Sequence, residues 1–181
     1  MHEHESLLAR AQAGDRDAFQ QLLCPMQRPV MRFLSQFVDH NDASDIAQET
    51  FILAVRKIQQ FEFKSTFRAW VFRIAYRQML NFQKTKSNRK LQSIEETQIE
   101  ARPLMTSDQT EQGQIVLDLV EQLPELQRQV VWFRIHDQLS FKEIAAICNQ
   151  SINTILSRMH KAKKNLALKM KSVGIETGVN L

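Results

Sequence analysis

The stretch from residue 140 to residue 164 constrains the fold of this chain most, because it predicts two short helices joined by a tight turn. Ser140 and Glu143 have the spacing of a capping box, in which a hydroxyl and a carboxylate each accept a hydrogen bond from a backbone N–H. Ser151 can cap the second helix. Asn149, between them, tolerates the left-handed conformation that a sharp turn needs. The pattern is that of a helix-turn-helix.

The second of these helices is expected to have two unlike sides. Apolar residues recur along one side at helical spacing, at Ile155, Met159, Ala162 and Leu166. From residue 151 to residue 172 there are six basic residues and no acidic one. A polar, basic helix of this kind suits the major groove of DNA, whereas a solvated face in a helical bundle is the plainer alternative. The candidate DNA-contacting residues are Asn153, Thr154, Ser157, Arg158, Lys161 and Lys164.

Composition favours an all-α protein of two small helical domains joined by a flexible linker, the second containing the helix-turn-helix. The 181 residues include only four glycines and four prolines, and the net charge is +4. The charge is +5 over residues 1–90, −4 over 91–113 and +3 over 114–181, so an acidic connector separates two basic blocks. The expected division is 1–84, a linker 85–113, a second domain 114–172 and a flexible tail 173–181.

Further features narrow the class of protein. Cys24 and Cys148 lie in apolar helical patterns and are expected to be buried thiols in a reducing cytosol. The longest apolar runs have five residues, so no membrane insertion is expected. The sequence shows no nucleophile–base pair, phosphate loop or metal-ligand cluster. We therefore expect neither an enzyme nor a bound cofactor.

Helical periodicity also organises the first half of the chain. A short helix is expected over 5–13, and Asp15 or Asp17 can cap the next one. Pro25 and Pro29 should interrupt that helix, which resumes over 30–38. A longer helix is expected over about 43–60 and another from residue 65 or 66 to about residue 84.

Residues 61–82 hold seven of the chain's 14 aromatic side chains. Trp70, Arg73, Arg77, Asn81 and Lys84 share one side of the expected helix, because they are spaced three or four residues apart. Basic groups beside an exposed aromatic ring suit single-stranded nucleic acid, since the ring stacks on an unpaired base for ~1–3 kcal/mol. The alternative is an amphipathic core helix with Trp70 packed inside.

Together these residues resemble bacterial sigma factors of the extracytoplasmic-function (ECF) group. The first half carries Asp45-Ile-Ala-Gln-Glu-Thr-Phe51 and Phe67-Arg-Ala-Trp-Val-Phe-Arg-Ile-Ala75. The second half carries Leu123-Pro124, the capping box with Ile144-Ala145, and the Ser151–Ala162 recognition pattern. The resemblance spans about residues 6–84 and 114–168. The chain departs from the family pattern at several positions. Arg77 stands where Asn is frequent, Asn81 where Asp is, Gln138 and Asn149 where Gly is usual, and Leu156 where Lys or Arg is common.

The resemblance implies three roles. The helix around residues 42–55 would dock on the clamp coiled coil of the largest polymerase subunit, through Asp45, Gln48, Glu49, Phe51 and Ile52. The region 61–84 would capture flipped bases of the non-template strand at the −10 element, through Phe63, Trp70, Arg73, Arg77, Asn81 and Lys84. The helix from residue 151 would read the −35 element, and the acidic linker would run near the RNA exit path.

These roles describe a sigma factor that directs core RNA polymerase to specific promoters and assists promoter melting, as an alternative factor responding to stress or a signal. Its expected partners are core RNA polymerase, including the flap region, promoter DNA and an anti-sigma factor. Its expected location is the cytoplasm, with the nucleoid when it is in holoenzyme. Two other classes share some of these features. A two-domain transcriptional regulator would bind duplex DNA without polymerase, and an RNA-binding or enzymatic accessory protein would leave the helix-turn-helix unexplained.

Overall fold

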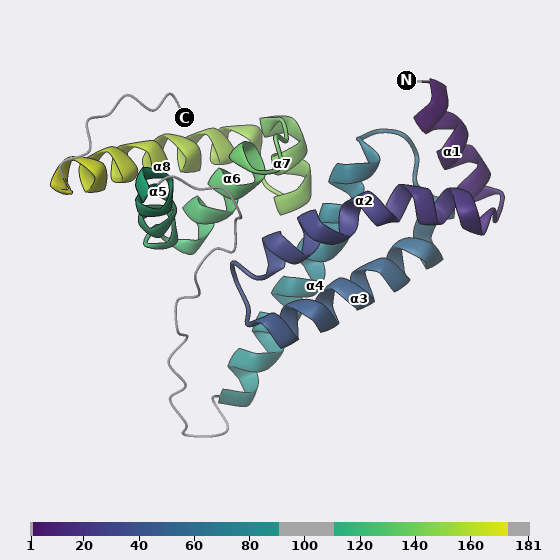
Figure 1. The fold of residues 1–181 in the computed structure, drawn as a ribbon, viewed down its shortest axis with the longest axis horizontal. Helices are drawn as coiled ribbons and strands as arrows, with labels where there is room; N and C mark the ends of the chain where they lie inside the picture. The colour runs from purple at the N-terminus through teal and green to yellow at the C-terminus, as the bar shows by residue number, and fades with distance from the viewer. Residues whose placement is uncertain (1, 91–110, 174–181) are drawn as a thin grey trace. The chain divides into compact units, whose positions relative to one another are not determined.

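A computed structural model of the chain describes residues 2–90 and 111–173, and every regular element in these ranges is a helix (Figure 1). The chain divides into two compact units, residues 1–96 and 97–181. The all-α prediction, with two helical domains, is confirmed. The first unit contains α1 (His2–Gln12), α2 (Arg16–Leu34), α3 (His40–Lys57), the 3₁₀ turn η1 (Ile58–Gln60) and α4 (Phe67–Lys90); the second contains α5 (Glu111–Glu121), α6 (Glu125–Ile135), α7 (Phe141–Cys148) and α8 (Ile152–Ser172).

The first unit is built on α2, α3 and α4, each of which packs against the other two, while α1 packs on α2. Phe33 of α2 and Phe72 of α4 meet edge to face, with their ring centroids 5.8 Å apart, and both are fully buried. Truncating a buried Phe to Ala costs about 3–5 kcal/mol. This aromatic contact therefore fixes α4, which carries the candidate single-strand surface, on the three-helix core.

The expected interruption of the helix at the two prolines is wrong. Helix α2 runs unbroken from Arg16 to Leu34, with Pro25 and Pro29 inside it. Of the two candidate caps, Asp15 and Asp17, it is Asp15 that caps the helix, and its carboxylate accepts from the N–H groups of Asp17 and Ala18. A proline inside a helix costs about 3 kcal/mol. Burial of the apolar side of α2 on both sides of the prolines offsets that cost; the buried residues include Leu22, Leu23, Met26, Val30 and Phe33.

The position of Cys24 on α2 determines its exposure. Cys24 is exposed, so its expected burial is wrong, whereas Cys148 is buried as expected. Leu22, Leu23 and Met26 form the buried side of α2. Cys24 lies on the other side of the helix, since successive residues are separated by 100°.

Some helix ends also differ from the expected domain boundaries. Helix α4 continues to Lys90, six residues past the expected end at Lys84, and α5 begins at Glu111 rather than near Gln114. Both ends of the predicted linker 85–113 are thus helical. The rest of that linker, and the predicted tail beyond residue 173, lie outside the described residues.

The second unit holds α8 against α5, α6 and α7. The capping box is present: Glu143 N–H donates to the Ser140 hydroxyl at 3.2 Å, and Ser140 N–H donates to the Glu143 carboxylate at 2.9 Å. Asn149 has φ 51° and ψ 48°, the left-handed conformation predicted for the turn. The N–H of Gln150 then donates to the Ala145 carbonyl at 2.9 Å, which closes the end of α7.

A second left-handed residue lies between α6 and α7. Gln138 has φ 53° and is exposed, and the following N–H, of Leu139, donates to the Phe133 carbonyl at 3.0 Å. A residue with a Cβ is strained in this conformation by roughly 1–2 kcal/mol, whereas glycine is not and asparagine tolerates it better.

We therefore expect Gln138→Gly to raise the free energy of unfolding of the second unit by about 1 kcal/mol. Asn149→Gly is the matched control and should gain less, because Asn already tolerates the left-handed conformation. Trp132 fluorescence in a Trp70→Phe background, followed in denaturant, would report the second unit alone. A loss of stability in Gln138→Gly would contradict the strain argument.

Candidate nucleic-acid interface

Helix α8 presents three parallel rows of side chains outside its buried stripe. Ile155, Met159, Ala162 and Leu166 are buried, as predicted. The central exposed row, here called the recognition face, consists of Asn153, Ser157, Lys161 and Lys164. Thr154 and Arg158 form one flanking row and are half-buried, and Ile152 and Leu156 form the other and are exposed. Four of the six candidate residues therefore share one exposed face, and two lie beside it.

The start of α8 is fixed by hydrogen bonds. The Thr154 N–H donates to the Ser151 hydroxyl at 3.0 Å, and the two hydroxyl oxygens lie 2.8 Å apart in a further hydrogen bond. The Thr154 side chain is thus part of the helix cap. An N-cap of this kind contributes about 1 kcal/mol, and it holds the first turn of the recognition helix in one orientation.

Contacts with α6 and with the turn between α5 and α6 hold the far part of α8. The Asn165 amide donates to the Gln127 side chain at 2.9 Å, and the Lys169 ammonium donates to the Gln122 side chain at 2.8 Å. Between α6 and α7, the Arg134 guanidinium lies 5.1 Å from the centre of the Phe141 ring and donates to the Leu139 carbonyl. The recognition face is therefore carried by a helix that packs on α5, α6 and α7 and is tied by hydrogen bonds in its later turns.

In the first unit, four aromatic rings form what we call the aromatic cluster: Phe61, Phe63, Phe67 and Trp70. The Phe61 ring lies 5.0 Å from Phe63, 5.9 Å from Phe67 and 5.5 Å from Trp70, centroid to centroid. Trp70 is half-buried, so it is neither a fully exposed ring nor a residue packed inside the core. Phe63 is 50% exposed, and its φ of 56° is rare for an aromatic residue. Phe63 is the member of the cluster that is most open to an incoming base.

A basic stripe runs along α4 from this cluster. It consists of Arg73, Arg77, Asn81 and Lys84, of which Arg73 is half-buried and the other three are exposed. The spacing places all four on the side of α4 that carries Trp70. Cationic groups and a partly exposed aromatic side chain thus lie on one surface. That arrangement is chemically suited to a bare phosphate backbone with unstacked bases.

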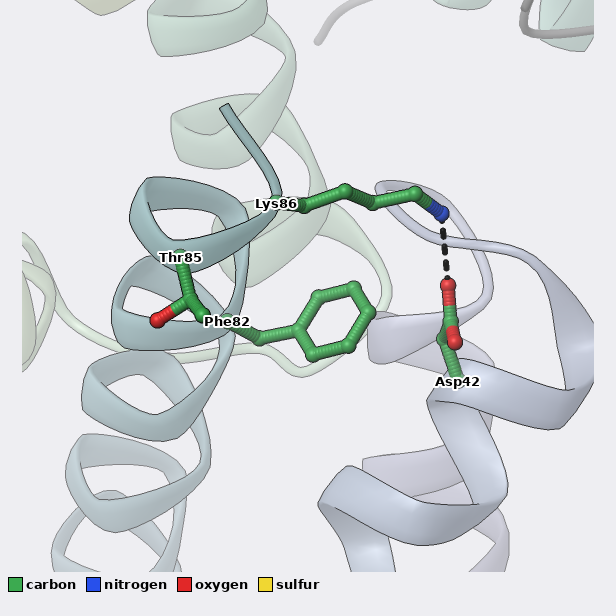
Figure 2. A pocket seen from close by; sticks show the side chains of 4 residues that line it. All are labelled: Asp42, Phe82, Thr85 and Lys86. Carbon is green, nitrogen blue, oxygen red and sulfur yellow. Dashed lines mark hydrogen bonds and ion pairs between the residues drawn. The ribbon is translucent and has the colours of Figure 1, made fainter. Parts of the chain in front are cut away.

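Sequence reasoning missed a pocket on the other side of α4. It has a volume of about 450 Å³ and is lined by Asp42, Phe82, Thr85 and Lys86 (Figure 2). The Lys86 ammonium donates to the Asp42 carboxylate at 2.9 Å, lies 3.5 Å from Asp39 and lies 5.5 Å from the centre of the Phe82 ring. Lys86 therefore ties the added turns of α4 to the start of α3. No sequence signal near residue 86 indicated this partner, which lies more than 40 residues away in the chain.

Asp39 and Lys86 both have shifted pKa values. The backbone N–H of Asp42, followed by its side chain and by the Lys86 charge, lowers the pKa of Asp39 from 3.8. The Asp42 side chain raises the pKa of Lys86 above its ordinary value. Because the pKa of Asp39 is lowered by folding, its contribution to stability is present above about pH 3.8 and is lost as the pH falls below that value.

We expect Lys86→Gln to raise the pKa of Asp39 only in part. The largest cause, the Asp42 N–H that donates to Asp39 at 2.9 Å, remains in the variant. The loss of stability at pH 7 should be about 0.5 kcal/mol or less, as is usual for an exposed ion pair. Titration of the carboxylates by NMR would measure the pKa of Asp39 in the wild type and in the variant. A return of the Asp39 pKa to its ordinary value would contradict this expectation and would show that Lys86 is the main cause of the shift.

Helix α3 presents an acidic face of the first unit. Asp45, Gln48 and Glu49 are exposed, whereas Ile46, Ala47, Thr50 and Ala54 are buried on the opposite side. Ile52 is 38% exposed and Val55 51% exposed, and Phe51 is half-buried. Acidic and amide groups thus adjoin exposed aliphatic groups. Val55 was not among the predicted residues, although its place one turn after Phe51 indicated it.

The described residues contain no group of three or more His, Cys, Asp or Glu side chains that could hold a metal ion. Among the same residues, no helix is long and apolar enough to cross a lipid bilayer. The surfaces that remain to be explained are therefore the recognition face, the aromatic cluster with its basic stripe, and the acidic face of α3.

Comparison with known proteins agrees with the division of the chain into two helical units. Residues 25–89 match the family model for sigma-70 region 2, and residues 113–166 match that for sigma-70 region 4. Two solved structures share the fold. The sigma factor RpoE of Bartonella quintana, in complex with the anti-sigma factor NepR, has a TM-score of 0.71 at 24% identity and covers 84% of this chain and 96% of that one. CnrH, in complex with the cytosolic domain of CnrY, has a TM-score of 0.66 at 22% identity and covers 92% and 96%.

Curated relatives are more similar in sequence. The ECF RNA polymerase sigma-E factor of Escherichia coli (strain K12) is 33% identical over 172 residues, which are 87% of this chain and 89% of that protein. The protein of the same name in Haemophilus influenzae is 29% identical over 178 residues, 92% and 94% of the two chains. With sigma-70 regions 2 and 4 in order and a relative of this similarity over nearly its whole length, the chain belongs to the ECF family of RNA polymerase sigma factors, non-enzymatic proteins that direct core polymerase to promoters for transcription initiation.

Proposed function

We propose that the three surfaces divide the work of initiation among them. The acidic face of α3 docks on the clamp coiled coil of core polymerase, and the aromatic cluster with the basic stripe binds the opened −10 strand. The recognition face reads the −35 element as duplex. The functional domains are then residues 1–84 and 114–172, with the linker 85–113 between them and the tail 173–181 after them.

The observation that carries this proposal is that two chemically different nucleic-acid surfaces occur in one chain. The recognition face is polar and cationic and has no exposed aromatic ring, as suits contact with base edges and phosphates of a duplex. The aromatic cluster exposes the Phe63 ring and part of the Trp70 ring, on which an unstacked base can stack. A protein with both surfaces is suited to bind promoter DNA before and after strand separation.

The polymerase contact is supported by the chemistry of α3. Asp45, Gln48 and Glu49 offer acceptors to basic partner groups, and Ile52 and Val55 offer apolar area beside them. An apolar centre with a charged border is typical of protein interfaces. In the second unit, we propose contact with the polymerase flap region, on the ground of the family membership alone.

We further propose that an anti-sigma factor regulates this chain and that the factor is of the alternative, signal-responsive kind. The structurally similar RpoE of Bartonella quintana is held by an anti-sigma factor. An inhibitor that covered the acidic face of α3 would compete directly with core polymerase. Such competition needs no change in the fold of either unit.

Run-off transcription from genomic fragments tests the central proposal. The full chain added to core polymerase should yield promoter-specific transcripts, and core polymerase alone should yield none. A gel shift on duplex promoter, with and without core, separates this activity from that of a regulator that binds DNA unaided. Failure of the chain to bind core at micromolar concentration would overturn the proposal.

Variants of the recognition helix extend the test. We expect Arg158→Ala or Lys161→Ala to weaken binding of the holoenzyme to the −35 element while leaving core binding unchanged. A bidentate Arg–guanine contact contributes about 1–3 kcal/mol, whereas loss of a phosphate contact lowers the salt slope of binding by about 1. Since Arg158 is half-buried and Lys161 exposed, Lys161→Ala should change the salt slope more. Unchanged affinity and salt slope in both variants would refute the assignment.

A further inference from the structure

Two large aliphatic side chains are exposed to solvent beside the recognition face. Ile152 is 44% exposed and Leu156 is 43% exposed, and they lie one turn apart in the first two turns of α8. The rest of the exposed surface in these turns is polar, with Asn153 and Ser157 in the adjoining row. Single exposed aliphatic residues are common on protein surfaces. A pair at the reading end of a DNA-binding helix is different, because base pairs of the major groove lie within its reach.

The major groove offers one apolar group, the C5 methyl of thymine. Guanine instead presents two acceptors, N7 and O6, which need donors. Leu156 has no donor, so a guanine opposite it would lose water without gaining a hydrogen bond. A thymine opposite it would bury a methyl group against the leucine, which is favourable. An Arg or Lys side chain at this position would instead be suited to guanine.

We propose that Leu156, flanked by Ile152, is a specificity-determining residue that contacts a thymine methyl in the −35 element and disfavours guanine at that position. The partner of the apolar row formed by Ile152 and Leu156 is thus DNA, because this row adjoins the recognition face on the same helix. The inference rests on the proposed function, in which α8 reads duplex DNA.

The test begins with selection of −35 sequences from a randomised duplex by holoenzyme reconstituted with the full chain. The wild-type protein should select a T·A pair at one or more positions, and Leu156→Arg should shift one of them to G·C. Each thymine of the selected site is then replaced by deoxyuridine, which lacks only the C5 methyl. One replacement should weaken binding by roughly fourfold, as expected for one buried methyl-sized group.

The variant Leu156→Ala separates a contact from a coincidence. It should lose the sensitivity to that uracil, because the methyl no longer has a partner, so the two changes should not be additive. The matched control is Leu168→Ala, on the same helix and 62% exposed, which should keep the full wild-type sensitivity. Ile152→Ala should reduce the sensitivity without abolishing it.

The inference would be overturned by a selected site without thymine on either strand, by an affinity unchanged by every uracil, or by wild-type uracil sensitivity in Leu156→Ala. A variant Leu156→Ala that binds promoter normally but transcribes poorly would assign the row to a protein contact instead, and would also overturn it. If wild-type holoenzyme selects no −35 sequence at all, the proposed function fails rather than this inference alone. Selection of a defined site with no uracil effect leaves the function intact and removes only the role of Leu156.

Discussion

Replacing Trp70, Arg73 and Arg77 together with alanine should leave holoenzyme able to bind duplex promoter DNA but unable to open it efficiently. Stacking of one base on an aromatic ring contributes about 1–3 kcal/mol, so its loss alone should slow opening by roughly 10- to 100-fold. The two arginines lie on the same side of α4 as Trp70 and would hold the exposed backbone of the strand. Permanganate reactivity of unpaired thymines measures the opening.

A bubble template separates the two roles that Trp70 has in this fold. Its ring lies 5.5 Å from Phe61 and 5.7 Å from Phe67, so Trp70→Ala also removes packing. A pre-melted bubble should restore initiation by the variant if only capture of bases is lost, because the cost of unstacking has already been met. Trp70→Phe, which keeps an aromatic ring, should open duplex better than Trp70→Ala.

Lys86→Ala is the matched control for the loss of charge. Lys86 lies on the same helix but on the side opposite the basic stripe, where it is bound by Asp42. Its removal should leave opening close to the wild-type rate. Normal opening by the triple variant, with its fold intact by circular dichroism, would return α4 to a structural role.

The second large effect is expected at the polymerase contact. Reversing both charges in Asp45→Lys/Glu49→Lys should weaken binding to core polymerase by on the order of 100-fold. Close charge pairs at protein interfaces couple by about 1.5–7 kcal/mol, and each reversal turns an attraction into a repulsion. Both side chains are exposed on α3, away from its buried residues, so the melting temperature should change little. Fluorescence anisotropy of labelled chain titrated with core would measure the affinity.

Two controls give this result its meaning. Glu5→Lys reverses an exposed acid on α1 of the same unit and should not weaken the association. The defect of the double variant should shrink at high salt, since ions screen exposed charges. If the melting temperature fell as steeply as the affinity, Asp45 and Glu49 would have a structural role and the docking assignment would fail.

Local features of the chain were predictable because they depend on neighbours in sequence. The Ser140–Glu143 capping box, the Asp15 and Ser151 caps and the left-handed Asn149 each involve residues within three positions of one another or a single backbone conformation. Helical spacing likewise predicted the buried stripe of α8. These local patterns were sufficient to identify the family, and the family identifies the activity.

Other features depended on contacts between residues far apart in the chain. Helix α2 passes through Pro25 and Pro29 because its buried side packs on α1, α3 and α4, a gain that no local rule for proline includes. Helix α4 continues beyond Lys84, where Lys86 meets Asp42 across the unit. The two flanks of the recognition face look equivalent in a helical projection. Only the tertiary structure distinguishes them: Arg158 on one flank is half-buried, whereas Leu156 on the other is exposed.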